Sequence, residues 1–340
     1  MSLMRSELLE APRILKELDK NKGAILAAAE SIKRNDFRSI VFVARGTSNN
    51  AAMYFKYLCE AKSGIRVSKY FHSVTTKLNK SIMLDNSAVL AVSQSGKGTD
   101  TLEVVNVCIS QGANVLSLTN YADSPLAKMS AWHAELLCGE EKSVAATKTF
   151  TAQIALLTLL SNALANKPLT NLTKIAEKLE QFNENSAQVE ETARKIADKD
   201  CFAVISRGSM QFIAEEFCLK LTETAYKIAR AFSAAEFLHG PFAMMDERRT
   251  GILLAPSGPF GTDFIENAKK LKESGAVLVA FSDIPEVLQT ADYAIKMPGT
   301  DESSPFLYTL AIQRFAETVS VSLGLNPDKP RGLNKVTVTV

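Results

Sequence analysis

The chain has 340 residues, 46% of them hydrophobic, which is enough to bury the cores of two ordinary domains. Its 39 basic and 37 acidic residues leave a formal charge of +2, so neither a nucleic acid nor a membrane is expected as a partner. The five cysteines are odd in number and far apart, which favours a reducing, cytoplasmic location. No signal peptide pattern opens the chain, and its most apolar stretch, residues 154–165, is too short to span a bilayer.

In chain order, a helical lead-in over residues 1–34 is expected to precede a first α/β domain over residues 35–168. A connecting amphipathic helix over residues 169–199 leads to a second α/β domain over residues 200–325. An extended tail over residues 326–340, alternating at Val336, Val338 and Val340, completes the chain. Within the domains, short apolar runs predict strands at residues 40–44, 89–92, 113–119, 202–205, 252–254 and 277–279.

The two domains repeat three short motifs at the same places relative to the predicted strands. The counterparts are Arg45-Gly46-Thr47 and Arg207-Gly208-Ser209, Ser95-Gly96 and Ser257-Gly258, and Gly112-Ala113 and Gly275-Ala276. Each offset is 162 or 163 residues. Equal offsets predict two copies of one unit, each a doubly wound, mostly parallel sheet flanked by helices.

Two loops rich in small hydroxyl residues form the candidate ligand site. They are residues 46–49 and residues 93–99, and each is predicted to run from a strand into a helix. Backbone N–H groups at a helix start, together with Ser and Thr hydroxyls, suit a phosphate monoester. These hydroxyls could instead only cap the helices, but two such loops in one domain favour binding.

Motifs for other ligand classes are missing from the sequence. No G-x-G-x-x-G follows the first predicted strand, and no G-x-x-x-x-G-K-[ST] occurs. The sequence therefore contains no motif for binding a dinucleotide or a nucleoside triphosphate. The three histidines, His72, His133 and His239, are far apart and have no ligand-like spacing. We therefore expect no metal site and no cofactor.

The second domain carries a cluster of ionisable residues. Glu216, Lys220 and Glu223 are spaced by four and three, so they share one helix face. The common interpretation of this pattern is a solvated face with an ion pair. Nearby, residues 236–241 place a Glu and His239 beside a Gly-Pro turn, although a lone histidine is more often structural. By themselves, the residues predict an α/β protein with a phosphate site.

Taken together, the motifs resemble the SIS (sugar isomerase) family, and within it the isomerase half of the glucosamine-6-phosphate synthases. The resemblance runs in order along essentially the whole chain. It is carried by Met4–Pro12, Gly46–Ser48, Ser93–Gly96, Val144–Gln153, Leu219–Glu223, Glu236–Pro241 and Pro330–Lys335.

This resemblance implies a role for each matching position, with neither metal nor cofactor. The sugar phosphate would be bound by Thr47, Ser48, Ser93, Gln94, Ser95, Val144, Ala145 and Lys220, with Thr99 as the replacement for a missing hydroxyl. Glu223 would move a proton between C1 and C2 of the open-chain sugar. His239 would assist ring opening from the partner subunit of a homodimer with shared active sites. Lys335 would approach the C2 carbonyl and could form an imine.

The sequence departs from the family pattern at three places. Lys97-Gly98 stands where Glu-Thr is usual, Ala146 replaces a serine before Thr147, and Asn49-Asn50 replaces Tyr-His. These changes bear on the identity of the substrate more than on the type of reaction.

The resemblance does not include a glutaminase half, so the expected reaction converts glucosamine-6-phosphate to fructose-6-phosphate and ammonia. One alternative is the same reaction type on galactosamine-6-phosphate or a fructosamine-type phosphate. Another is a non-catalytic regulator that binds a sugar phosphate. The presence of Glu223, His239 and Lys335 argues against the regulator, while the sequence does not separate the two enzymes.

Overall fold

The computed structural model describes residues 1–297 and 301–335, which form two compact units. The N-terminal unit comprises Glu10–Glu141, Lys148–Lys174 and, in the described part of the tail, residues 333–335. The C-terminal unit comprises Met1–Leu9, Lys142–Thr147 and Ile175–Gly332. The start of the chain and the short segment 142–147 therefore belong to the C-terminal unit, which the linear domain order does not anticipate.

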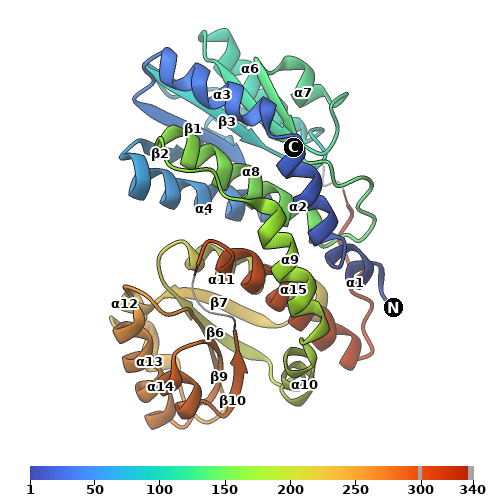
Figure 1. The fold of residues 1–340 in the computed structure, drawn as a ribbon, viewed down its shortest axis with the longest axis vertical. Coiled ribbons are helices and arrows are strands. Elements are labelled where there is room, and N and C mark those ends of the chain that lie inside the picture. The colour runs from blue at the N-terminus through green and yellow to red at the C-terminus, as the bar shows by residue number, and fades with distance from the viewer. Residues whose placement is uncertain (298–300, 336–340) are drawn as a thin grey trace. The chain divides into compact units, whose positions relative to one another are not determined.

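The N-terminal unit is built on a five-stranded parallel sheet in the order β2-β1-β3-β4-β5 (Figure 1). Its strands are β1 (Ser39–Ala44), β2 (Arg66–Lys69), β3 (Ser87–Val92), β4 (Val115–Thr119) and β5 (Trp132–Glu135). Every residue of β3 and β4 is buried, as expected for apolar strands covered on both faces. Because all pairs are parallel, the carboxyl ends of the strands lie along one edge of the sheet.

The C-terminal unit repeats this topology in the order β7-β6-β8-β9-β10. Its strands are β6 (Cys201–Ser206), β7 (Ile228–Ser233), β8 (Thr250–Ala255), β9 (Val277–Ser282) and β10 (Tyr293–Lys296). All of its strand pairs are also parallel. The structure thus confirms the prediction of two tandem, doubly wound α/β units.

Helices cover the faces of each sheet. In the N-terminal unit, α4 and α8 pack on each other on one side, and α6 and α7 lie on the other (Figure 1). The helices of this unit are α2 (Ala11–Lys20), α3 (Gly23–Arg34), α4 (Gly46–Ser63), α5 (His72–Thr76), α6 (Thr99–Ser110), α7 (Pro125–Met129) and α8 (Lys148–Leu164). The C-terminal unit has α1 (Leu3–Leu8), α10 (Ala187–Lys195), α11 (Met210–Ala225), α12 (Ala234–Phe237), the 3-10 helix η1 (Pro241–Met244), α13 (Gly261–Glu273), α14 (Pro285–Thr290) and α15 (Ser304–Ser322).

Two long helices, α8 and α15, are buried on nearly all sides. This explains why the most apolar stretch of the sequence falls in α8, since a helix without a solvent face needs apolar residues all round. Two of the buried polar side chains of α8 have partners inside the unit. The Thr158 hydroxyl donates to the Ile154 carbonyl at 2.7 Å, and the Asn162 amide donates to Thr170 at 3.0 Å. Within the described residues, no helix has the length and apolar character that a membrane crossing requires.

Two expected segments differ in detail. The single connecting helix is divided into α9 (Leu172–Glu184) and α10, because the chain turns at Asn185-Ser186, where the Ser186 side chain is buried beside Arg314. The described part of the tail, residues 326–335, forms turns instead of an extended segment. The alternating Val336, Val338 and Val340 lie outside the described residues.

Candidate functional site

The strand order places a topological switch point between β1 and β3. From these two neighbours the chain continues in opposite directions, to β2 and to β4, which leaves a crevice at their carboxyl ends where ligands bind in such sheets. Ala44 pairs with Val92, so the loops that follow the two strands begin side by side. The structure therefore brings together the two hydroxyl-rich loops that the sequence singled out.

The second loop has a conformation that only glycine permits at position 96. Gly96 has φ +62°, and a Cβ there would lie 2.4 Å from Oγ of Ser124. Oγ of Ser93 accepts from the Gly96 N–H at 3.1 Å, and Oγ of Ser95 accepts from the Lys97 N–H at 3.3 Å. A hydroxyl that accepts in this way can donate its own hydrogen to a phosphate oxygen. Gln94 is fixed in the same loop because its carbonyl accepts from the Asn120 N–H at 3.0 Å.

The first loop opens α4 and presents Thr47 and Ser48. Ser48 is buried, and its Oγ accepts from Nε2 of Gln153 in α8 at 3.0 Å. Gln153 was not among the predicted site residues, although it lies in one of the motifs of the resemblance. Thr99, the proposed replacement hydroxyl, is exposed at the first position of α6.

An ion pair connects the two loops across the switch point. Nε and Nη2 of Arg45, the residue before α4, lie 2.8 and 2.7 Å from Oδ2 of Asp100 at the start of α6. His72 lies close by, with Nε2 3.3 Å from the Thr101 hydroxyl. Burial, followed by the positive charge of Arg45, lowers the pKa of His72 to about 4, so its imidazole is neutral at neutral pH.

Lys335 reaches a buried carboxylate of the N-terminal unit. Its Nζ donates to Oε2 of Glu141 at 2.7 Å, and the Glu141 side chain is fully buried. Thr149 donates to the same carboxylate from its N–H at 3.1 Å and from its hydroxyl at 2.8 Å. Glu141 was missed from the sequence because 194 residues separate it from Lys335.

The ionisable cluster of the second repeat lies on α11. Lys220 Nζ is 2.7 Å from Oε2 of Glu223 and 3.3 Å from Oε1 of Glu216. The expectation of a solvated face is wrong, because the side chains of Glu216 and Lys220 are fully buried while that of Glu223 remains 24% exposed. The reason is packing: α11 lies beside α15 (Figure 1), and Phe217 meets Phe315 edge-on at 5.4 Å.

The cluster has a defined charge distribution. Burial by itself would lower the pKa of Lys220, but the two carboxylates outweigh it and raise that pKa above its usual value. Lys220 is therefore a fixed cation. Of the two carboxylates, only Glu223 retains contact with solvent, which leaves it as the accessible base.

The remaining predicted site residues also lie in the C-terminal unit. Val144 and Ala145 stand in segment 142–147, and the Val144 N–H donates to the Asp328 carbonyl at 3.3 Å. His239 is exposed in the turn after α12, before Gly240 at φ +141°. Within the described residues, no hydrogen bond or ion pair joins His239 to Glu223, and no group of three or more His, Cys, Asp or Glu side chains could hold a metal ion.

The second repeat keeps part of the first repeat's loop architecture but fills the crevice differently. Arg207 pairs with Asp263 at the positions equivalent to Arg45 and Asp100. The N–H and Oγ of Ser257, the counterpart of Ser95, donate to Asp283 at 2.7 and 2.6 Å. Asp283 follows β9 at the position where Asn120 follows β4. In the second repeat the Asp283 carboxylate therefore accepts from Ser257, whereas the equivalent residue of the first repeat is a neutral amide.

The two repeats each match the same family model, that of the SIS domain, over residues 35–163 and 195–322. The chain belongs to the SIS domain family. The glutamine–fructose-6-phosphate aminotransferase [isomerizing] of Thermococcus kodakarensis is 33% identical over 355 residues, which cover 99% of this chain and 58% of the relative. This SIS protein therefore spans a little over half the length of that relative.

Solved structures agree with this assignment. The C-terminal domain of glucosamine-fructose-6-phosphate aminotransferase from Francisella tularensis superposes with a TM-score of 0.86 at 25% identity, covering 97% of this chain and 98% of that one. The glucosamine-6-phosphate deaminase of Thermotoga maritima shares the fold, with a TM-score of 0.81 at 22% identity, covering 99% of this chain and 100% of the other. The SIS protein is thus homologous to the isomerase portion of the aminotransferase.

Proposed function

We propose that this SIS protein is an amino-sugar-phosphate isomerase and deaminase that converts glucosamine-6-phosphate and water to fructose-6-phosphate and ammonia. The observation that carries the proposal is the α11 cluster, where a buried ammonium holds two carboxylates and leaves Glu223 accessible. A carboxylate in that state can take up and return a proton. The named activity of the homologous aminotransferase supports an isomerisation at fructose-6-phosphate.

Substrate binding is assigned to the loops at the β1–β3 switch point. The phosphate would accept from the Ser48, Ser93 and Ser95 hydroxyls and from N–H groups at the start of α4 and α6. Thr47, Gln94 and Thr99 line the same two loops, and Val144, Ala145 and Lys220 complete the proposed set. Because the hydroxyl and N–H donors of the two loops are neutral, they would bind a monoester dianion through directed hydrogen bonds and helix dipoles.

Proton transfer is assigned to Glu223. It would remove the proton from C2 of the open-chain aldose and return it to C1, while one proton of the C2 amine passes to the C1 oxygen. The C1 aldehyde thereby becomes a hydroxymethyl group, and the C2–N bond becomes a double bond. The product is the 2-imine of the ketose. Lys220 stays protonated throughout, so its charge holds the Glu223 carboxylate in place without taking part in the proton balance.

Release of ammonia is assigned to Lys335. Its neutral amine would attack C2 of the 2-imine, and ammonia would leave as the new imine forms; water then hydrolyses that imine to the ketone and frees the lysine. The amine must first lose a proton, and Oε2 of Glu141 is the acceptor within hydrogen-bond distance.

We further propose that the active form is a homodimer in which His239 of the partner subunit assists ring opening. The exposed position of His239 in its turn suits a group that acts on another chain. Mixing the Glu223→Gln and His239→Asn variants tests this, because hybrid dimers would contain one intact site. Lack of recovered activity after verified subunit exchange would contradict the shared site.

The decisive experiment is a panel of hexose and aminohexose 6-phosphates, scored for ammonia and for ketose product. Glucosamine-6-phosphate should give both in equal amounts, and the Glu223→Gln variant should lose at least about a hundredfold in kcat, the usual effect of removing a general base. Glu215→Gln is the matched control, since Glu215 lies on the same helix outside the cluster.

Three outcomes would separate the alternatives. Turnover of galactosamine-6-phosphate or a fructosamine-type phosphate in place of glucosamine-6-phosphate would change the substrate but keep the chemistry. Binding of sugar phosphates without turnover would indicate a regulator. Unchanged activity in Glu223→Gln would overturn the assignment of the base.

A further inference from the structure

Helix α1 at the start of the chain holds segment 142–147 through one buried carboxylate. Glu7, only 5% exposed, accepts from the backbone N–H of Lys142 and from the N–H of Ser143, at 3.2 Å to Oε2. The Ser143 hydroxyl lies 2.5 Å from the same Oε2. Hydrogen bonds to an ionised acceptor are roughly twice as strong as neutral ones, so this contact strongly favours one conformation of the segment.

The rest of the segment is anchored to the C-terminal unit at two more points. The Val144 N–H donates to the Asp328 carbonyl at 3.3 Å, and the Thr147 carbonyl accepts from Nε2 of Gln313 in α15 at 3.1 Å. The backbone is thus held before, at and after the two residues assigned to the sugar, Val144 and Ala145. Glu7 is the anchor of the first part.

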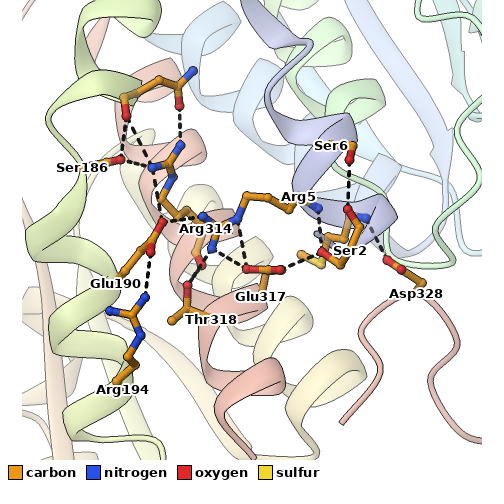
Figure 2. A network of polar contacts seen from close by, with 12 residues as sticks. Ser2, Arg5, Ser6, Ser186, Glu190, Arg194, Arg314, Glu317, Thr318 and Asp328 are labelled. Carbon is orange, nitrogen blue, oxygen red and sulfur yellow. Dashed lines mark hydrogen bonds and ion pairs between the residues drawn. The ribbon is translucent and has the colours of Figure 1, made fainter. Parts of the chain in front are cut away.

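Helix α1 has only six residues, too few to be stable without tertiary contacts. Figure 2 shows how its amino end is fixed. The N–H groups of Leu3 and Met4 each donate to the Asp328 carboxylate at 2.8 Å, which also places a negative charge at the positive end of the helix dipole. Asp328 therefore contacts both α1 and segment 142–147, through its side chain and its backbone.

The side of α1 is fixed by Arg5, at the centre of the network in Figure 2. Its Nε donates to Oε2 of Glu317 in α15 at 3.0 Å, its Nη2 donates to the Thr318 hydroxyl at 2.8 Å, and its Nη1 pairs with Glu190 of α10. Ser2 adds a bond from its hydroxyl to Glu317 at 2.7 Å. Glu7 consequently projects from a helix that has one position relative to α10 and α15.

We propose that Glu7 is a positioning residue, which sets the conformation of segment 142–147 so that Val144 and Ala145 can bind the sugar phosphate. This rests on the proposed function. The physical reason is that a segment binds a ligand through directed hydrogen bonds, which weaken steeply when their distance and angle change. In Glu7→Gln, one carboxylate oxygen becomes an NH2 donor that faces the donors of Ser143, so the segment has to move.

The test compares Glu7→Gln with Glu190→Gln. Each variant removes one carboxylate: Glu7 contacts segment 142–147, and Glu190 contacts Arg5 of α1. Glu190 also pairs with Arg194 and Arg314, but it does not contact segment 142–147. Glu7→Gln should raise KM for glucosamine-6-phosphate about tenfold, the loss expected from a hydrogen bond to a charged group, with a smaller change in kcat. Glu190→Gln should keep the wild-type KM, even if it lowers the melting temperature as much as Glu7→Gln does.

Amide hydrogen exchange supplies a readout that does not depend on turnover. Peptides that contain residues 142–147 should exchange faster in Glu7→Gln and at the wild-type rate in Glu190→Gln. Faster exchange with no turnover by the wild-type protein would reject the proposed function while retaining the role of Glu7 in the segment. Equal exchange in the two variants, or a KM that follows the loss of stability in both, would overturn the positioning role.

Discussion

Nε and Nη2 of Arg45 both approach one carboxylate oxygen of Asp100, and this pair joins the loop after β1 to the start of the helix after β3. The same pair recurs in the second repeat as Arg207 and Asp263. In each unit it spans the switch point of the sheet. The two repeats therefore share this loop-to-loop contact, while the residue after the fourth strand of each sheet order differs, with Asn120 after β4 and Asp283 after β9.

The first prediction uses this duplication as its control. Arg45→Ala should release the two loops and raise KM for the sugar phosphate about tenfold, because the phosphate donors lose their common position. The stability should fall by about 2 kcal/mol, because the Asp100 side chain that loses its partner is only 8% exposed. Arg207→Ala removes the equivalent pair and should leave KM unchanged. Equal effects on KM would show that the first pair has no special link to binding.

The second prediction concerns the number of ligands bound. Because Asp283 already accepts from the N–H and Oγ of Ser257, the second crevice should exclude a phosphate by charge and by occupancy. Calorimetry should then give one sugar phosphate per chain. Ser95→Ala should weaken binding about tenfold through the lost hydrogen bond, whereas Ser257→Ala should have no effect. A stoichiometry of two would contradict this interpretation.

The sequence was sufficient for the central part of each sheet and for the two hydroxyl-rich loops. Strands β1, β3 and β4 are mostly apolar and buried along nearly their whole length, which is the pattern of strands covered on both faces. The same holds for their counterparts β6, β8 and β9. Edge strands were missed: β2 has four residues, three of them exposed, so it shows neither an apolar run nor a regular alternation. The order of the strands then followed from the repeat once one unit was known.

Contacts between residues distant in sequence were beyond prediction. The spacing of Glu216, Lys220 and Glu223 predicted a shared helix face but not its burial, because the packing of α15 on α11 does not appear in that spacing. Glu141 and Glu7 were missed for the same reason, as their partners lie 194 and 136 residues away. Carboxylates of this kind are recognised only when their donors are seen around them.

The third prediction is a dependence of stability on pH that originates at His72. Its folded pKa, about 4, lies below the ordinary value of 6.5, so the unfolded chain binds the proton first as the pH falls. The contribution of the neutral, buried imidazole is complete above pH 6.5 and is lost as the pH falls towards 4. Relative to His72→Gln, the wild type should lose on the order of 2 kcal/mol over this range in chemical denaturation. If the free energy of unfolding depends on pH in the same way in the two proteins, His72 is not the source of the effect.

The last prediction concerns the imine. With fructose-6-phosphate and borohydride, the wild-type protein should be modified at Lys335, because reduction traps the bond between Nζ and C2. Lys335→Ala should abolish the modification and most of the activity. It should lower stability by about 2 kcal/mol, the loss of one hydrogen bond to a charged group, since Thr149 continues to donate twice to the buried Glu141.

The role of Glu141 in this step is separable from that of the lysine. An ammonium cannot attack a carbonyl, so the proton must pass to a nearby base, and Oε2 of Glu141 lies 2.7 Å from Nζ. Glu141→Gln should therefore slow trapping, because the base that accepts the proton from Nζ is lost. The neighbouring, exposed Glu140 offers the control, because Glu140→Gln changes the local charge equally. If the two variants trap the sugar at the same rate, the proton leaves Lys335 by another route.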